Sequence, residues 1–373
     1  MSLGFRTATF PIPFLPTNKA GTSQLIEVPS QAYLPIILHI PTTDIDMTET
    51  FGPDMNQKTK ATTRKKGFIP VMLTTFTEEG KVDYDALTRL TEAYLEAGAA
   101  GLFANCLSSE MFDLDAEERI GVTRHVVRIA RGRVPVVASG TFSTDNGSQA
   151  AFIRRIHDTG VQAVIILSNM LAAEKEPDRV FQDNFRRLLD ATGEIPLGFY
   201  ECPTPYKRLV GGALLGECVR TGRLIYHKDT CCDIGQVRDK LQQTQAHADS
   251  FGLYDAFMGH AVDTLRAGSA GLSCIQGNLW PELVTWLCNH AENPDRKEDT
   301  ALVGEFFQKT MDIAHHLYPL NAKHFLKRRG WRIGTRTRRE VRKPTEKEMD
   351  DLDLLYNVSK QLYDRLGITM VKA

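Results

Sequence analysis

From Gly67 onward, short apolar segments rich in β-branched residues alternate with stretches of helical periodicity. Each apolar segment is four to six residues long, which is typical of strands buried in a parallel sheet. Because a helical stretch follows each one, eight successive strand-helix units are expected, and this order predicts an α/β fold. The predicted strands are residues 68–73, 101–105, 134–138, 163–167, 196–200, 224–228, 251–254 and 271–274.

Capping residues support these units. Asp115 followed by Glu118 has the form of a capping box at a helix start, and Pro177 suits the first position of another helix. Glycines that can end helices in the left-handed conformation precede several predicted strands, at Gly98, Gly160, Gly193, Gly222 and Gly268. The pattern fits a (β/α)8 barrel. An open doubly wound sheet has the same local pattern, so periodicity leaves both architectures open.

The chain divides into three predicted regions. Residues 1–66 contain prolines too densely spaced for a helix and form an N-terminal extension. The strand-helix units occupy residues 67–292, and residues 293–373 form a C-terminal helical region. Helical periodicity without strands runs over residues 282–330 and 345–366.

The composition excludes several classes of protein. The 45 basic and 46 acidic side chains leave a formal net charge of -1, and the apolar run at residues 34–40 is far shorter than the ~20 residues that span a bilayer. Seven cysteines without a C-x-x-C pair are expected to be reduced thiols. We therefore expect a cytoplasmic protein that is not bound to a membrane.

Lys228 interrupts a predicted strand where an apolar residue is expected. Alternation along the strand places Tyr226 and Lys228 on one face and His227 on the other. If the first face is the barrel interior, burial lowers the pKa of the lysine and frees an amine that can attack a carbonyl. The alternative is a lysine that extends outward from the strand end.

Two further strand ends carry polar groups. Tyr200 ends the preceding strand, where a phenol could transfer protons, although packing explains a single tyrosine equally well. Ser108 and Ser109 lie between a strand and the helix capped by Asp115, and their hydroxyls and backbone N–H groups suit a carboxylate. A serine pair in a turn is also a common loop.

Taken together and in order, these residues resemble the dihydrodipicolinate synthase / N-acetylneuraminate lyase family, which comprises Schiff-base lyases and aldolases with a (β/α)8 barrel. The resemblance covers about residues 67–330. It rests on Gly67-Phe-Ile-Pro-Val-Met-Leu-Thr-Thr-Phe76, Ser108-Ser109-Glu110, Tyr200-x-x-Pro203, Lys228-Asp-Thr230 and Gly271-Leu-Ser273.

The resemblance implies a barrel and a metal-independent reaction without a cofactor. Lys228 would form an imine with pyruvate or a related 2-oxo acid, and Tyr200 would move the proton. Ser108 and Ser109 would hold the substrate carboxylate, while Leu272 and Ser273 would line the pocket. The resemblance also implies a homo-oligomer, either a dimer or a tetramer.

Three departures argue against dihydrodipicolinate synthase activity itself. Leu107 stands where the synthases use a hydroxyl, Leu171 where they use a tyrosine from a neighbouring subunit, and Pro205 where they use an arginine. Lys207 and Arg208 follow closely and could contact the distal end of a substrate. Aldol cleavage, aldol addition or dehydration of another 2-oxo acid, such as a 2-keto-3-deoxy sugar acid, stays open.

Other patterns lead to different hypotheses. Ten of the 21 residues in 323–343 are lysine or arginine, which is compatible with a nucleic-acid or other anionic partner, although the near-zero net charge favours a solvated surface or a subunit contact. A non-catalytic protein that binds a 2-oxo acid is a further alternative. His227 is expected to face the helices as a core residue. No nucleotide-binding or zinc motif is present, so we expect neither a bound nucleotide nor a metal. Because the net charge is close to zero, we do not expect nucleic acid as a partner.

Overall fold

The computed structural model describes residues 65–373, so the extension predicted at residues 1–66 lies almost wholly outside the described residues. Eight parallel strands follow the order β1-β8-β7-β6-β5-β4-β3-β2. A parallel bridge between Val71 and Phe103 joins the two ends of this series, which closes the sheet into the predicted (β/α)8 barrel. The strands are β1 (Gly67–Phe68), β2 (Leu102–Asn105), β3 (Val136–Ser139), β4 (Ala163–Leu167), β5 (Leu197–Tyr200), β6 (Leu224–Asp229), β7 (Gly252–Asp255) and β8 (Gly271–Leu272).

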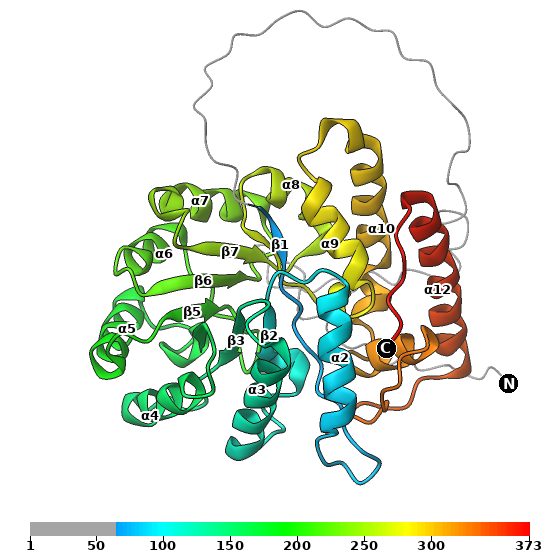
Figure 1. Ribbon diagram of the computed structural model, residues 1–373. Coiled ribbons are helices and arrows are strands. Elements are labelled where there is room, and N and C mark those ends of the chain that lie inside the picture. Colours follow the sequence, from blue (N-terminus) through cyan, green and yellow to red (C-terminus); the bar gives the residue numbers. More distant parts are fainter. Residues whose placement is uncertain (1–64) are drawn as a thin grey trace, which may run out of the picture. The chain divides into compact units, whose positions relative to one another are not determined.

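Helices surround the strands, as Figure 1 shows. Within residues 65–373, one helix follows each strand of the barrel, and three more follow α9. The helices are α2 (Tyr84–Glu96), α3 (Ala116–Ala130), α4 (Asn146–His157), α5 (Asp178–Thr192), α6 (Gly212–Val219), α7 (Ile234–Thr244), α8 (Ala261–Arg266), α9 (Pro281–His290), α10 (Lys297–His315), α11 (Leu320–Arg328) and α12 (Glu346–Leu366).

The predicted helix boundaries are largely confirmed. Asp115 accepts a hydrogen bond from the Glu118 N–H at 2.8 Å, and the Glu118 side chain accepts one from the Asp115 N–H, which completes the capping box. Pro177 is the N-cap of α5 rather than its first helical residue, because its ψ of 156° is extended. The five predicted helix-ending glycines all have positive φ, at Gly98, Gly160, Gly193, Gly222 and Gly268.

The seam between β1 and β8 depends on glycine. Gly271 has a φ of 150°, and a Cβ atom built on it would lie 1.7 Å from the Gly67 carbonyl oxygen. Only a residue without a side chain allows the two backbones to approach so closely. Both strands are shorter than predicted. Beyond Phe68, Pro70 has no N–H group to donate to a neighbouring strand, so the regular ladder of β1 stops there.

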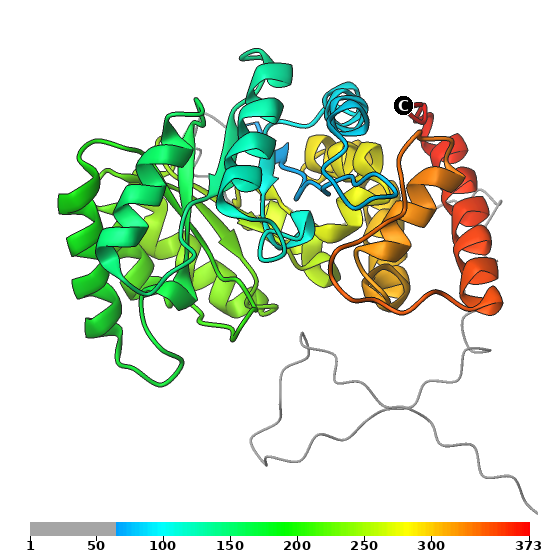
Figure 2. The same cartoon turned by 90° about the horizontal axis from the view of Figure 1, so that it is seen from below.

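The C-terminal helical region packs against the barrel side that carries α9. The Arg329 guanidinium and the Tyr363 hydroxyl both contact the buried Glu282 carboxylate of α9, the latter at 2.8 Å. In Figure 2 the orange and red C-terminal segments lie together at one side of the barrel. Residues 66–373 form one compact unit. Within the described part of the chain, no helix is both long and apolar enough to cross a bilayer.

Candidate active site

Lys228 lies on β6 with its side chain inside the barrel. Only 4% of its surface is exposed, and its Nζ atom lies 4.2 Å from the centre of the Tyr200 ring. Tyr226, two residues before Lys228, belongs with Tyr200 to the cluster of core residues inside the barrel. The predicted alternation along this strand therefore holds. The outward-extending alternative for Lys228 is therefore excluded.

The environment of Lys228 favours the neutral amine. Burial lowers the pKa of Lys228 because a desolvated site penalises the ammonium form. The thiols of Cys106, Cys202 and Cys274 have a smaller, opposite effect on the same pKa. A neutral amine inside a barrel is a nucleophile that can condense with a ketone.

Tyr200 is the strand neighbour of Lys228. The two residues are register partners between β5 and β6, as the sequence predicts, and Phe103 meets the Tyr200 ring edge-on at a centroid distance of 5.9 Å. Burial raises the pKa of Tyr200 well above its usual value. The phenol therefore keeps its proton at neutral pH, and the face of its ring lies against the amine.

The predicted serine turn forms a short 3-10 segment, η2 (Leu107–Ser109), at the end of β2. The Ser109 hydroxyl donates to the Met72 carbonyl oxygen at 2.7 Å and accepts from the Cys106 N–H at 3.1 Å. The Ser109 N–H donates to the Cys106 carbonyl oxygen at 3.0 Å. Ser109 therefore holds the turn against the segment that follows β1, so its hydroxyl is already bound within the protein.

The two predicted pocket residues, Leu272 of β8 and Ser273 directly after it, are fully buried. The Ser273 hydroxyl is 3.2 Å from the Tyr226 hydroxyl, which donates to it, and the Ser273 N–H donates to the Asp255 carbonyl oxygen at 2.8 Å. Leu272 has no exposed surface. Ser273 thus contacts the same strand face that carries Lys228.

A buried charged cluster lies behind the candidate site, and the sequence analysis did not find it. The Lys240 ammonium of α7 is 2.7 Å from Glu201 Oε1 and 2.6 Å from Asp229 Oδ2, and none of the three side chains is exposed. Glu201 also accepts a hydrogen bond from the Thr230 N–H at 2.8 Å. Since Glu201 and Asp229 directly follow Tyr200 and Lys228, the cluster fixes the ends of β5 and β6 relative to each other.

The sequence carries a weak signal for this cluster. Side chains alternate along a strand, so a residue directly after an inward-facing one faces outward. Glu201 follows Tyr200 and Asp229 follows Lys228, which places both carboxylates against the helices. A buried acidic pair needs a cation, and Lys240 lies on the face of α7 that packs on the barrel. Pairing these residues still requires knowledge of the three-dimensional packing.

His227 lies beside this cluster and faces outward, as predicted. Its Nε2 atom is 3.6 Å from Glu201 Oε1 and 3.7 Å from Asp229 Oδ2. Burial acts to lower the pKa of His227, but the two carboxylates outweigh it and raise the pKa. The three residues have the ligand types of a metal site. The Lys240 ammonium already lies between the two carboxylates and would repel a metal ion. The cluster therefore does not fit a metal site.

Part of the basic segment is folded onto the barrel. Lys323 Nζ is 2.8 Å from Glu110 Oε1, and neither side chain is exposed. The backbone N–H groups of Arg338 and Arg339 donate to the other oxygen of Glu110 at 2.6 and 2.9 Å, and the Arg338 guanidinium binds Glu118 in a bidentate manner. The expectation of a solvated surface is therefore wrong for Lys323 and incomplete for Arg338.

The two basic residues after Pro205 have structural partners. Arg208 is buried and donates to the Glu176 carbonyl oxygen at 2.6 Å and to Asp178 Oδ1 at 2.9 Å. Lys207 Nζ donates to the Thr230 carbonyl oxygen at 2.8 Å. The Arg208 guanidinium is thus held by the connection between β4 and α5.

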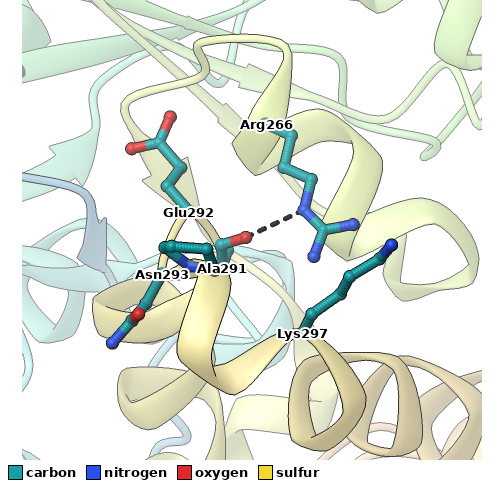
Figure 3. A pocket seen from close by; sticks show the side chains of 6 residues that line it. Arg266, Ala291, Glu292, Asn293 and Lys297 are labelled. Carbon is teal, nitrogen blue, oxygen red and sulfur yellow. Dashed lines mark hydrogen bonds between the residues drawn. The ribbon is translucent and has the colours of Figure 1, made fainter. Parts of the chain in front are cut away.

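A separate cavity of about 360 Å³ lies away from Lys228, at the turns that precede β8 and α10. Figure 3 shows Arg266 donating to the Ala291 carbonyl oxygen, with Glu292 and Lys297 on either side. These turns follow helices, so they lie at the amino-terminal ends of the strands. In (β/α)8 barrels the chemistry is found at the opposite end. The cavity is lined by Arg266, Ala291, Glu292, Asn293, Pro294 and Lys297.

The fold and the site define a class of protein: a (β/α)8 barrel with a desolvated interior lysine beside a tyrosine at the carboxyl ends of the strands. Comparison with known proteins agrees with this class. Residues 64–357 match the model of the dihydrodipicolinate synthetase family, and the chain belongs to that family. The resemblance inferred from the motifs is confirmed.

Individual relatives are distant. A 4-hydroxy-tetrahydrodipicolinate synthase of Pseudomonas aeruginosa is 24% identical over 229 residues, which cover 61% of this chain and 76% of that protein. The protein described as probable 2-dehydro-3-deoxy-D-pentonate aldolase YjhH of Escherichia coli is 24% identical over 225 residues, covering 58% and 71%. Such identities are consistent with a divergent member of the family.

Solved structures share the fold. YagE, a prophage protein of Escherichia coli K12 from the dihydrodipicolinic acid synthase family that was solved in complex with pyruvate, has a TM-score of 0.70 at 20% identity, covering 82% of this chain and 99% of its own. Dihydrodipicolinate synthase DapA-2 of Bacillus anthracis has a TM-score of 0.70 at 19% identity, covering 79% and 98%.

Proposed function

We propose that this protein is a Schiff-base-forming lyase or aldolase that acts on pyruvate or a related 2-oxo acid. The observation that carries the proposal is the buried Lys228 amine, placed 4.2 Å from the ring of its register partner Tyr200. Membership in a family of aldolase-type lyases supports it. The pyruvate complex of YagE supports the choice of ligand.

The proposed chemistry needs only groups that the chain supplies. The Lys228 amine attacks the ketone carbon of the 2-oxo acid, and loss of water leaves an iminium ion. Cleavage of the bond between the third and fourth carbons transfers its electron pair into the iminium and gives an enamine and an aldehyde. Tyr200 carries the proton that leaves the fourth-carbon hydroxyl, and protonation of the enamine followed by hydrolysis regenerates the amine. Aldol addition is the reverse sequence.

The substrate is proposed to differ from that of dihydrodipicolinate synthase. Leu107 is packed against the core, and Leu171 is buried with 1% of its surface exposed, so neither position offers a hydroxyl for the proton relay of the synthases. We propose a sugar-derived 2-oxo acid instead, and the likeness to the probable 2-dehydro-3-deoxy-D-pentonate aldolase supports this substrate class.

Borohydride reduction in the presence of pyruvate tests the proposal. The wild-type protein is expected to gain a stable adduct, detected by mass spectrometry of the intact chain, and Lys228→Ala is expected to gain none. Lys309→Ala, which removes a partly exposed lysine of α10, is the matched control and should react like the wild type. Absence of an adduct with pyruvate and with a panel of 2-keto-3-deoxy sugar acids would refute the proposal.

A further inference from the structure

The chain turns away from the direction of β5 directly after Tyr200. The Cys202 N–H donates to the Tyr200 carbonyl oxygen at 2.8 Å, which closes a turn of three residues. Beyond Tyr200, the backbone bonds to β6 through the Glu201 N–H, which donates to the Lys228 carbonyl oxygen at 3.3 Å. Backbone hydrogen bonds are usually about 2.9–3.0 Å long, so this bond is a weak one. The backbone ladder alone therefore gives little hold on Tyr200 at the level of Lys228.

The side chain of Glu201 supplies the attachment that the backbone lacks. Its carboxylate accepts hydrogen bonds from the Val210 N–H at 2.8 Å, the Thr230 N–H at 2.8 Å and the Lys240 ammonium at 2.7 Å. The Thr230 hydroxyl also donates to the Glu201 carbonyl oxygen at 2.7 Å. Glu201 is fully buried, and hydrogen bonds to a charged group are the stronger class. Glu201 is thus the anchor of the end of β5.

Asp229 is the corresponding anchor of β6. Its carboxylate accepts hydrogen bonds from the Cys231 N–H at 2.8 Å and from the Lys240 ammonium at 2.6 Å. Lys240 therefore bonds to both anchors, whereas the Nε2 atom of His227 lies 3.6 and 3.7 Å from them, beyond hydrogen-bonding distance. Glu201, Lys240 and Asp229 form a bridge that joins the ends of the two strands through α7.

The bridge lies one peptide unit away from the candidate site. Glu201 directly follows Tyr200, and Asp229 directly follows Lys228, so a shift of either anchor also moves the neighbouring inward-facing side chain. The distance at stake is the 4.2 Å between the Lys228 Nζ atom and the centre of the Tyr200 ring. Reactions between positioned groups are sensitive to such shifts, since a misplacement of about 1 Å can lower a rate about 100-fold.

We propose that Lys240 is a positioning residue for proton transfer, because the bridge holds the Tyr200 phenol against the Lys228 amine. Formation of an imine needs the amine, whereas proton transfer at the imine needs the amine and the phenol at a fixed separation. The inference rests on the proposed function and adds to it a residue of an outer helix. Loss of the bridge is expected to impair proton transfer and to spare imine formation.

Two reactions of pyruvate separate these steps. Borohydride trapping measures formation of the imine at Lys228. Exchange of the methyl hydrogens in deuterated water measures proton transfer, because a proton leaves the third carbon to form the enamine and a deuteron from solvent returns to it. Tyr200 is the group that passes this proton. Nuclear magnetic resonance follows the loss of the methyl signal, and Lys228→Ala gives the background rate of exchange.

Two variants break the bridge with opposite changes of charge. Lys240→Met removes a positive charge, and Asp229→Ala removes a negative one while it leaves the contact between Lys240 and Glu201 in place. Arg329→Met is the matched control, because it removes one partner of the buried ion pair with Glu282 on the side of the C-terminal region. Tyr200→Phe shows the result of losing the phenol itself.

Both bridge variants are expected to lower the exchange rate at saturating pyruvate about tenfold to 100-fold, while their trapping rate at saturation changes less than about twofold. Tyr200→Phe should show the same split, and Arg329→Met should match the wild type in both reactions. Parallel losses of exchange and trapping would indicate a structural role and overturn the inference. Loss of exchange in one bridge variant alone would indicate an effect of charge and would also overturn it, as would normal exchange in both or in Tyr200→Phe.

Failure of the proposed function gives a different result. If the wild type forms no adduct with any 2-oxo acid and exchanges no faster than Lys228→Ala, the proposed function falls and the role of Lys240 falls with it. If the wild type does both and the bridge variants behave identically to it, only the role of Lys240 falls. Circular dichroism and thermal melting show which variants are folded. If Lys240→Met does not fold, the comparison of Asp229→Ala with Arg329→Met decides between the same outcomes.

Discussion

Replacement of Lys240 by methionine tests the buried charged cluster behind the candidate site. The substitution preserves much of the side-chain volume but removes the only ammonium between Glu201 and Asp229, at 2.7 and 2.6 Å. At an effective dielectric constant of about 20, each contact corresponds to roughly 6 kcal/mol of direct attraction. Desolvation of the charges offsets much of this, and loss of one partner of a buried ion pair lowers the free energy of unfolding by about 3–5 kcal/mol.

The pH dependence of this effect gives a second measurement. In the wild type, burial and the repulsion between the two carboxylates act to raise the carboxyl pKa values. The Lys240 ammonium outweighs these effects, so the pKa of both Glu201 and Asp229 is lowered. Their contribution to stability is therefore present above the ordinary carboxyl pKa values near 4 and is lost as the pH falls through the lowered values. In Lys240→Met one carboxyl group is expected to take up a proton instead, so the deficit should shrink between pH 7 and pH 4.

Urea unfolding followed by circular dichroism measures both quantities. Lys309→Met is the matched control, because Lys309 forms an exposed pair with Glu305 one helical turn away, and it should lower the free energy of unfolding by less than about 0.5 kcal/mol. A deficit for Lys240→Met below about 1 kcal/mol at pH 7 would refute the reasoning about buried charge. So would a deficit that stays constant as the pH falls.

Four further outcomes follow from the structure. Gly271→Ala should yield no folded barrel, because the new Cβ would lie 1.7 Å from the Gly67 oxygen; a soluble variant with native circular dichroism would contradict this. The rate of adduct formation should rise with pH with a midpoint below the usual lysine pKa of about 10.4, since burial lowers the pKa of Lys228, and a midpoint at or above that value would oppose the assignment. Tyr200→Phe should still form the borohydride adduct but turn over at least about 100-fold more slowly; equal turnover would remove Tyr200 from the proton transfer. Retention on heparin at physiological salt should be weak, because Lys323 and Arg338 already bind acidic side chains, and a steep salt dependence would revive the nucleic-acid hypothesis.

Local patterns predicted the alternating strands and helices and the inward-facing residues well. Alternation along one strand was enough to place Lys228 inside, and the glycine before each of several strands identified helix ends that adopt positive φ. These signals are local, because they depend on backbone geometry over a few residues. The choice between a closed barrel and an open sheet required the resemblance to the family.

Long-range contacts escaped the sequence analysis. Lys240 lies 39 residues from Glu201, and Lys323 lies 213 residues from Glu110, so no local pattern pairs them. The serine pair also shows the limit of a motif, since the Ser109 hydroxyl is bound to the Met72 carbonyl oxygen within the protein.

The position of the reduced adduct is the most direct test of the central proposal. Lys228, Lys240 and Lys323 are all buried, but the last two form ion pairs with carboxylates, so we propose that Lys228 is the one of these three lysines that condenses with a ketone. After borohydride reduction with pyruvate and proteolysis, mass spectrometry of the peptides should find the modification on Lys228 alone. An adduct on another lysine of the wild-type chain, or an adduct that survives in Lys228→Ala, would contradict the proposal.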